Sequence, residues 1–383
     1  MSLSYAPKVV TNGLVFYYDQ ANTKKSWLGA PTTNLQSTPA TSNYGQYGPF
    51  VPAITQSDTV PTTYGTSRNV LRVRCDLDIW GPCFYWVPPA LTAGTMYTVS
   101  FYARTIDIAS ASMRFSNQNG SGDENNLSHS HTITTQWQRY TYTNTLNVAK
   151  NVYYVWGTNG ATLEFADFQI EASSWATPFV NGTRSNTQAI LDITNNYTIT
   201  ANSLNYNNDN TFNFNGSNSN LDAPPPNVGN FSIDIVAKWT SSLSDVFACG
   251  TEPMGSGISG GTYIKTHIQS NGMFTDLYSP QVLGGGWKSG NVVSGSFTTN
   301  TTYNITIVNS GTIWYYYSNG VYLGSYDHTY LANTGSSRTG IFRNHVQIVG
   351  NAGYVYAYKQ YNQALTAQQV QQNFAAQRGR YGI

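Results

Sequence analysis

The segment Ile313-Trp-Tyr-Tyr-Tyr-Ser-Asn-Gly-Val-Tyr-Leu-Gly-Ser-Tyr326 decides the fold class, because two aromatic and β-branched runs meet at an Asn-Gly pair. Asn319 and Gly320 supply the two positive φ angles of a type I′ turn, which predicts a β-hairpin. Further runs alternate apolar and polar residues with the period of two of half-buried strands. They span residues 97–104, 137–143, 163–171, 231–239 and 301–309. Their number and spacing are typical of a β-sandwich.

The composition supports the same fold class. The chain has 383 residues, of which 10% are charged and 14% are aromatic, including 29 Tyr. A chain this long is expected to form two or three domains, and residues that favour strands dominate it. The net charge is +1, and the 19 Lys and Arg form no runs. We therefore expect neither nucleic acid nor an anionic membrane surface as a partner.

One helix is predicted, near the C-terminus. Thr366 can cap it, and Val370 and Phe374 lie four residues apart on one face. We expect both side chains and Tyr381 to pack against a sandwich, and Gly379 to end the helix.

The cysteines and the N-terminus bear on cellular location. Cys75, Cys83 and Cys249 are an odd number and too few for a disulfide framework. Cys75 and Cys83 can face each other across a hairpin, but we expect buried thiols. No secretory signal precedes the first strand, and no apolar run is long enough for a membrane span. These features fit folding in a cytoplasm.

Proline and glycine indicate a domain boundary at each end of a central unit. Pro31, Pro39 and the glycine-rich residues 43–49 mark an irregular entry, and residues 174–185 mark an exit. Residues 32–185 are therefore predicted to form one unit. No tandem repeat relates this unit to the remainder of the chain.

The two ends of the chain carry a family resemblance. The stretch Asn12-Gly-Leu-Val-Phe-Tyr-Tyr-Asp19-Gln-Ala-Asn22 and the tail that closes on Arg378-Gly-Arg-Tyr-Gly-Ile383 resemble concanavalin A-like, laminin G-like lectin/glucanase modules of tailed phages, cyanophages especially. The stretch Leu191–Thr200 is similar to the segment that normally follows the first strand of these modules. The resemblance thus implies a discontinuous domain, residues 1–31 and 186–383, into which residues 32–185 are inserted.

The inserted unit resembles a second family. Phe165-Ala-Asp-Phe-Gln-Ile-Glu171, followed by Ala176-Thr-Pro-Phe179, is similar to the last strands of carbohydrate-binding-module jelly rolls. Taken together, the chain is expected to be all-β, with two β-sandwich (jelly-roll) domains, one of them discontinuous, and one short C-terminal helix.

The carboxylates give no clear sign of glycoside hydrolysis. Glu164 is separated from Asp167 and Glu171 by odd spacings in one strand, which places it on the opposite face. Asp167 and Glu171 would stand about 13 Å apart, whereas glycosidases need about 5 to 9.5 Å. Asp76 and Asp78 are two residues apart, and that spacing in a strand separates them by about 6.6 Å.

We interpret this last segment as a binding site. Trp80 follows the two aspartates, and aromatic rings stack on sugars while carboxylates accept hydrogen bonds from sugar hydroxyls. The glycan-binding candidates are Asp76, Asp78, Trp80 and Trp86, with aromatic packing as the alternative.

Metal ligands are sparse. His129 and His131 share a strand face but have no further ligand at a suitable spacing, so a solvated pair is expected. Asp167 stands where carbohydrate-binding modules often hold calcium, and Asp123 lies in an oxygen-rich loop. No cofactor is predicted beyond this possible Ca²⁺.

The resemblance implies a non-enzymatic protein of the virion surface, made in the host cytoplasm. As a tail-fibre or receptor-binding component it would bind host glycan. The alternatives are a capsid or neck decoration protein and a polysaccharide depolymerase. The expected partners are other virion proteins, further copies of the chain in a homo-oligomer, and host surface glycan.

Overall fold

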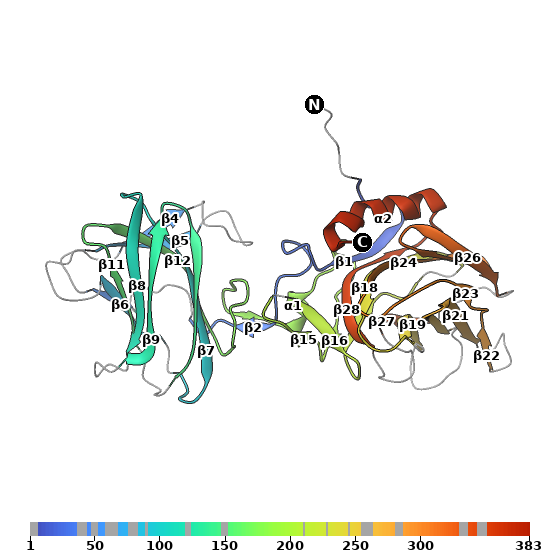
Figure 1. The fold of residues 1–383 in the computed structure, drawn as a ribbon, viewed down its shortest axis with the longest axis horizontal. Coiled ribbons are helices and arrows are strands. Elements are labelled where there is room, and N and C mark those ends of the chain that lie inside the picture. Colours follow the sequence, from blue (N-terminus) through green and yellow to red (C-terminus); the bar gives the residue numbers. More distant parts are fainter. Residues whose placement is uncertain are drawn as a thin grey trace, which may run out of the picture. The chain divides into compact units, whose positions relative to one another are not determined.

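The computed structural model folds into two compact units. Unit 1 comprises Met1–Ala30 and Asn186–Ile383, and unit 2 comprises Pro31–Ser185. The first boundary lies one residue before the predicted one. The structure describes residues 7–36, 44–46, 53–57, 68–75, 83–88, 91–118, 124–146, 152–209, 211–226, 229–243, 246–253, 263–279, 286–328, 336–342 and 351–383. Figure 1 shows the strands and helices of both units.

The first sheet of unit 1 joins the two ends of the chain. Its strands run in the order β15 (Asn205–Tyr206), β16 (Phe212–Asn215), β28 (Ala352–Tyr361), β18 (Asn230–Trp239), β24 (Thr302–Ser310), β25 (Ile313–Ser318), β26 (Val321–Asp327). In addition, β1 (Leu14–Asp19) pairs antiparallel with β28. The first strand of the chain therefore pairs beyond residue 186, which confirms the prediction of an interrupted fold.

In the described part of the chain, each of the two sheets of unit 1 has eight strands. The order in the second sheet is β14 (Ala201–Asn202), β17 (Asn220–Ala223), β27 (Ser336–Ile341), β19 (Val246–Pro253), β20 (Tyr263–Gln269), β21 (Gly272–Ser279), β22 (Gly286–Ser289), with β23 (Val293–Ser294) beside β21. Residues with alternating positions on the two sheets bury one apolar core that includes Phe16, Trp239, Trp314 and Tyr358. The predicted hairpin is confirmed, because Asn319 and Gly320 take φ angles of 49° and 74° between β25 and β26.

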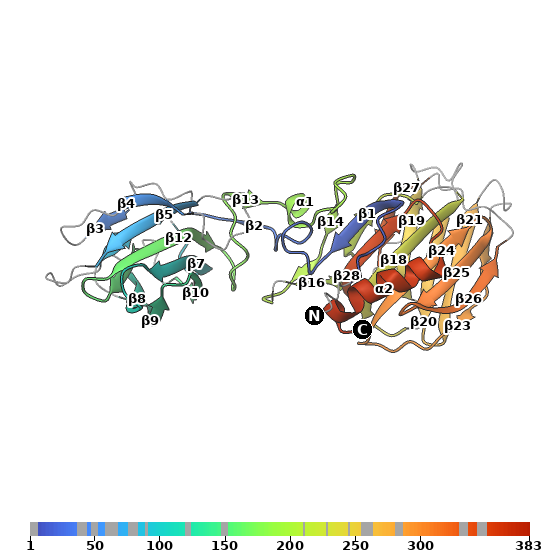
Figure 2. The same ribbon diagram turned by 90° about the horizontal axis from the view of Figure 1, so that it is seen from above.

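Helix α2 (Ala367–Tyr381) lies across β1, β18, β24 and β28 on the outer side of the first sheet, as Figure 2 shows. Thr366 caps it as predicted, but the predicted end at Gly379 was wrong. The helix runs through Gly379 to Tyr381, and the cap residue Gly382 has a left-handed φ of 68°. A Cβ at Gly379 would meet nothing within 4 Å. The buried face comprises Val370, Asn373 and Gln377, whereas Phe374 is only half-buried.

The remaining helix, α1 (Asn186–Ala189), is a single turn. Among the described residues, neither helix is both long enough and apolar enough to cross a membrane.

As far as its residues are described, unit 2 is a sandwich of two five-stranded sheets. One sheet has the order β10 (Gln138–Thr145), β7 (Met96–Thr105), β12 (Thr162–Glu171), β5 (Arg68–Arg74), β4 (Ala53–Ser57). The other has β3 (Tyr44–Gln46), β6 (Phe84–Trp86), β11 (Val152–Gly157), β8 (Ser110–Gln118), β9 (Glu124–Thr134). A separate core that includes Phe84, Phe101 and Phe165 fills the space between them. The short strands β2 (Thr32–Thr33) and β13 (Thr183–Arg184) pair where the chain enters and leaves the unit. The all-β prediction is confirmed for both units.

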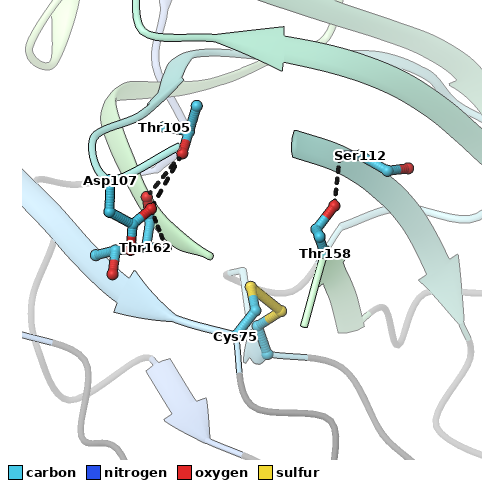
Figure 3. Close-up of a disulfide and its surroundings, with 7 residues drawn as sticks. Cys75, Thr105, Asp107, Ser112, Thr158 and Thr162 are labelled. Atoms are coloured by element: carbon cyan, nitrogen blue, oxygen red, sulfur yellow. Dashed lines mark hydrogen bonds between the residues drawn. A yellow bond between two sulfur atoms is a disulfide. The ribbon is translucent and has the colours of Figure 1, made fainter. Parts of the chain in front are cut away.

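Cys75 and Cys83 form a disulfide, so the expectation of two thiols was wrong. They do not face each other across a hairpin either, because Cys75 follows β5 in one sheet and Cys83 precedes β6 in the other. The Cys75 N–H donates to Ala161 O at 2.8 Å and the Cys83 N–H to Val155 O at 2.7 Å. Figure 3 shows the disulfide with the Thr105, Asp107 and Thr162 cluster nearby. Cys249 is a buried thiol, as expected.

A bulge in β12 changes the predicted facing of its acids. Between Ala166 and Gln169 the register against β7 shifts, and Asp167 takes a φ of 53°. The extra residue reverses the alternation. Glu164 and Glu171 consequently share the outer face, contrary to the prediction of opposite faces.

Candidate functional site

Most of the glycan-binding residues predicted from the sequence cannot be placed. Asp76, Asp78 and Trp80 lie outside the described residues, as does the calcium candidate Asp123. The backbone of Trp86 belongs to β6, where it pairs with β3 and β11, but its side chain lies outside the described part. The predicted site around Asp76 and Trp80 therefore stays a prediction.

Asp167, the other calcium candidate, lies at the bulge of β12. It is 8% exposed, and its charge acts on Arg139 and Tyr102 of the neighbouring strands. Among the described residues, no three His, Cys, Asp or Glu side chains gather in a metal-binding arrangement. The assignment of calcium to Asp167 and Asp123 therefore stays a prediction.

The two histidines of β9 face the edge of the core of unit 2. The ring centroids of His129 and His131 are 6.5 Å apart, and both rings contact Tyr142 of β10. Burial, and then the neighbouring His129, lower the pKa of His131. His129 is exposed and His131 is half-buried, so both rings pack beside Tyr142 at the edge of the sheet.

The outer face of the β3–β6–β11–β8–β9 sheet carries a row of aromatic rings. Tyr154 lies 6.1 Å from Tyr85 and 5.8 Å from Trp156, measured between ring centroids. We call Tyr85, Tyr154 and Trp156 the aromatic row of unit 2. The guanidinium of Arg114 lies over the Trp156 ring, with its Cζ 4.7 Å from the centroid. All four side chains are half-buried.

Strand alternation puts these residues on one face. Tyr153 and Val155 are fully buried, so their neighbours Tyr154 and Trp156 project from the opposite side of β11. Tyr85 is the direct partner of Tyr154 in β6, and Arg114 is the partner of Trp156 in β8. The pairing of β11 with β6 and β8, rather than closeness in the sequence, brings these residues together.

Small hydroxyl side chains adjoin the row. Ser112 on β8 and Ser130 and Thr132 on β9 are exposed on the same outer face. Apolar rings suit the C–H faces of a sugar, and hydroxyls and a guanidinium suit its oxygens. The face therefore combines an apolar platform with hydrogen-bonding groups beside it.

The opposite outer face of unit 2 is organised by ion pairs. Glu164, 1% exposed, accepts from Arg72 at 2.6 Å and from Arg104 at 2.7 Å. The Arg104 guanidinium also lies 4.7 Å from the centre of the Trp137 ring. On the same sheet, Glu171 accepts from the backbone and hydroxyl of Thr177. Glu164 thus stabilises the sheet through its two arginines, and Glu171 fixes the segment through which the chain leaves the unit.

The buried carboxylates of unit 1 are likewise engaged. Asp234 pairs with Lys359 at 3.0 Å, and both are fully buried. Asp222 pairs with Arg338 at 2.6 Å, and Asp19 pairs with Arg380. A buried charge needs such a partner, because desolvation without one is costly.

Asp222 and Asp276 share the outer face of the second sheet but are far apart. Along the ladder of paired strands, Asp276 is opposite Lys265, Lys265 opposite Gly250, Gly250 opposite Gly340, and Gly340 opposite Asp222. The two aspartates are therefore four strand spacings apart. At about 4.8 Å per spacing their separation is about 19 Å, twice the range of an inverting glycosidase.

The pKa of Asp276 also argues against a role as a general acid. Burial alone would raise this pKa, but hydrogen bonds from His267 and Ser289 and the charges of His267 and Lys265 lower it. His267 Nε2 lies 3.0 Å from the carboxylate. A proton donor at neutral pH needs a raised pKa instead.

The sequence reasoning missed the aromatic row of unit 2. The signal was present, because residues 152–157 read Val-Tyr-Tyr-Val-Trp-Gly, with rings at 154 and 156 on one face. What the sequence does not contain is the register that adds Tyr85 and Arg114 from two other strands.

No family model and no curated protein matches the sequence. Among solved structures, domain 4 of AbnA, a GH43 extracellular arabinanase from Geobacillus stearothermophilus in complex with arabinotriose, is 18% identical. The match covers 48% of this chain and 91% of that one, with a TM-score of 0.38. The CBM40 of the Ruminococcus gnavus IT-sialidase, bound to α2,3-sialyllactose, is 10% identical over 39% and 94% of the chains, with a TM-score of 0.31.

The receptor-binding domain of botulinum neurotoxin type G is 20% identical, with a TM-score of 0.36. This match covers 50% of this chain and 49% of that one. Each of these proteins resembles only a part of the chain. Likenesses of this size carry no conclusion about activity, so the case for function rests on the surfaces described above.

Proposed function

We propose that the protein is a non-enzymatic surface protein of a phage particle that binds host glycan through the aromatic row of unit 2. The proposal rests on the half-buried rings of Tyr85, Tyr154 and Trp156, which lie next to one another on one face of the sheet. The Arg114 guanidinium lies over the Trp156 ring. The phage assignment draws on the resemblance of the two chain ends to virion lectin-like modules.

The chemistry of the row supports a carbohydrate ligand. A sugar ring has apolar C–H faces and a polar rim, so it binds best where aromatic rings adjoin hydrogen-bonding groups. The row offers the rings, and Arg114, Ser112 and Ser130 offer donors and acceptors around them. The rings stand on paired strands, which hold them in place before the ligand arrives.

Binding without cleavage is supported by the carboxylates. Glu164, Glu171, Asp222 and Asp234 each hold a structural partner. Asp222 and Asp276 are too far apart for glycosidase chemistry. Asp76 and Asp78 remain the pair predicted from the sequence to stand at a separation that fits a depolymerase.

The proposal is tested by measuring glycan retention and reducing-end release together. The probes are a printed array of neutral and acidic oligosaccharides and polysaccharide extracted from host cells. We expect retention, no reducing ends, and a loss of about tenfold or more in affinity for Tyr154→Ala/Trp156→Ala. Trp137→Ala, on the opposite face, is the matched control and should bind like the wild type.

Three results would contradict the proposal. Unchanged retention by the Tyr154→Ala/Trp156→Ala variant would remove the aromatic row of unit 2 from the account. Sugar release that vanishes in Asp76→Asn/Asp78→Asn would make the protein a depolymerase. No retention of any probe by the wild type would favour the alternative of a capsid or neck decoration protein, held by other virion proteins.

A further inference from the structure

A second row of rings lies in unit 1, on the outer face of the first sheet. Tyr354 and Tyr356 of β28 have ring centroids 5.9 Å apart and ring planes within 8° of each other. Tyr381, the last residue of α2, continues the series at 5.7 Å from Tyr356. We call Tyr354, Tyr356 and Tyr381 the tyrosine row of unit 1. All three rings are half-buried.

The row lies where the cover provided by α2 ends. The helix buries the outer face as far as Gln377, and Tyr381 is its last residue. Val355, which lies between Tyr354 and Tyr356, points into the core, so these two tyrosines project outward. Lys238 on β18 is the direct partner of Tyr354, and its Nζ lies 4.4 Å from the ring centroid.

The ring contributed by the helix is fixed in place. The Tyr381 hydroxyl donates to the Asp19 carboxylate at 2.5 Å, and its oxygen also lies 3.2 Å from the Tyr356 carbonyl oxygen. Asp19, which is 1% exposed, also pairs with Arg380, the residue that precedes Tyr381 in the helix. Burial, and then the Asp19 carboxylate, raise the pKa of Tyr381, so the hydroxyl remains a donor at any physiological pH. A ring anchored in this way loses little freedom on binding.

The charge next to the row selects the ligand. Arg380 is neutralised by Asp19, and Asp234 of the same face is paired with Lys359. Lys238 is the cation that contacts a ring of the row. The arrangement parallels that in unit 2, where Arg114 lies over Trp156. In both units a half-buried series of rings ends at a cation, which favours a ligand with apolar faces and negative charge.

We infer that the tyrosine row of unit 1 is a second carbohydrate-binding site, which takes acidic sugars with a carboxylate next to Lys238. The inference rests on the proposed function for the class of ligand but uses a different surface. Two sites in one chain offer a polysaccharide two places to bind, and for a polymer long enough to reach both, the second contact forms intramolecularly. Weak sites then hold a polymer more tightly than they hold a short oligosaccharide.

The test compares full-length variants by calorimetry, with long oligogalacturonates as the acidic probe and cello-oligosaccharides as the neutral probe. Tyr354→Ala/Tyr356→Ala should raise the dissociation constant for the acidic probe about tenfold or more. Lys238→Met should remove the preference for the acidic over the neutral probe. Tyr322→Ala is the matched control, because Tyr322 is an exposed ring of the same sheet, 51% accessible; it should leave binding unchanged. Equal melting temperatures of the variants would show that folding is intact.

The outcomes separate this inference from the proposed function. If Tyr154→Ala/Trp156→Ala lowers binding and the unit 1 variants do not, the tyrosine row of unit 1 is not a site and the proposed function stands. If the unit 1 variants alone lower binding, the inference stands and the proposed site in unit 2 is wrong. If the wild type retains neither these two probes nor any oligosaccharide of the array, both are overturned.

Discussion

Asp192 shows how a single residue joins the two separated segments of unit 1. Its carboxylate accepts from the Tyr17 N–H at 2.9 Å and from four donors of residues 194–197. It is 3% exposed, so its loss leaves buried N–H groups unpaired. We expect Asp192→Ala to lower the free energy of unfolding by about 3 kcal/mol. Asp209→Ala, which removes an exposed local acceptor, should cost under about 1 kcal/mol in the same urea titrations.

His328 gives a pH dependence. Burial lowers its pKa to about 4, although Asp276, Thr275 and Asp327 act to raise it. In an unfolded chain a histidine has a pKa of about 6.5. Between about pH 4 and pH 6.5, the unfolded chain therefore binds a proton at His328 that the folded chain does not bind. Stability from this residue is complete above about pH 6.5 and is lost as the pH falls toward 4.

The expected size of this loss is about 2 kcal/mol between about pH 7.5 and pH 5. His328→Asn should reduce the pH dependence of the unfolding free energy by that amount. Equal pH dependence of the wild type and the variant would show that His328 is not buried in its neutral form.

At the scale of elements, α2 illustrates what a sequence pattern leaves undetermined. Spacing of four predicts Val370 and Phe374 on the buried face, but Val370 is fully buried and Phe374 packs beside Gly320 at the hairpin tip. The remainder of the buried face is polar. Asn373 accepts from the Val10 N–H and donates to the Tyr361 hydroxyl, and Val10 lies at the other end of the sequence.

This packing predicts unequal effects of two similar substitutions. Val370→Ala should cost about 2 kcal/mol or more, because it opens space in a closed apolar cluster with Tyr361 and Leu365. Phe374→Ala should cost less despite the larger ring, because part of that ring is already in water. Thermal unfolding of both variants measures the order, and a larger loss for Phe374→Ala would contradict the arrangement of the helix.

The strands were largely predictable, and the sites were not. Period-two patterns and the Asn319-Gly320 turn are local features, so residues near each other in sequence determine them. The bulge at Asp167, the Cys75–Cys83 disulfide and both rows of rings depend on which strands become neighbours. Such pairings join distant parts of the chain, and alternation alone does not specify them.

At the scale of the whole molecule, each unit has its own core, and only unit 2 contains the disulfide. We expect two calorimetric transitions. Closing a loop with a sequence separation of 8 stabilises a domain by about 2.5 kcal/mol in the chain-entropy description. Cys75→Ser/Cys83→Ser should therefore lower one transition and leave the other in place. A single transition that shifts as a whole would mean that the units unfold together.

The central claim is that the protein holds glycan without cutting it. Wild-type protein incubated with host-cell polysaccharide and passed over a sizing column tests this most directly, because the elution reports both complex formation and polymer length. We expect protein and polysaccharide to elute together and the polymer to keep its original length after the protein is removed. Shortened polymer, or protein that elutes alone, would contradict the claim.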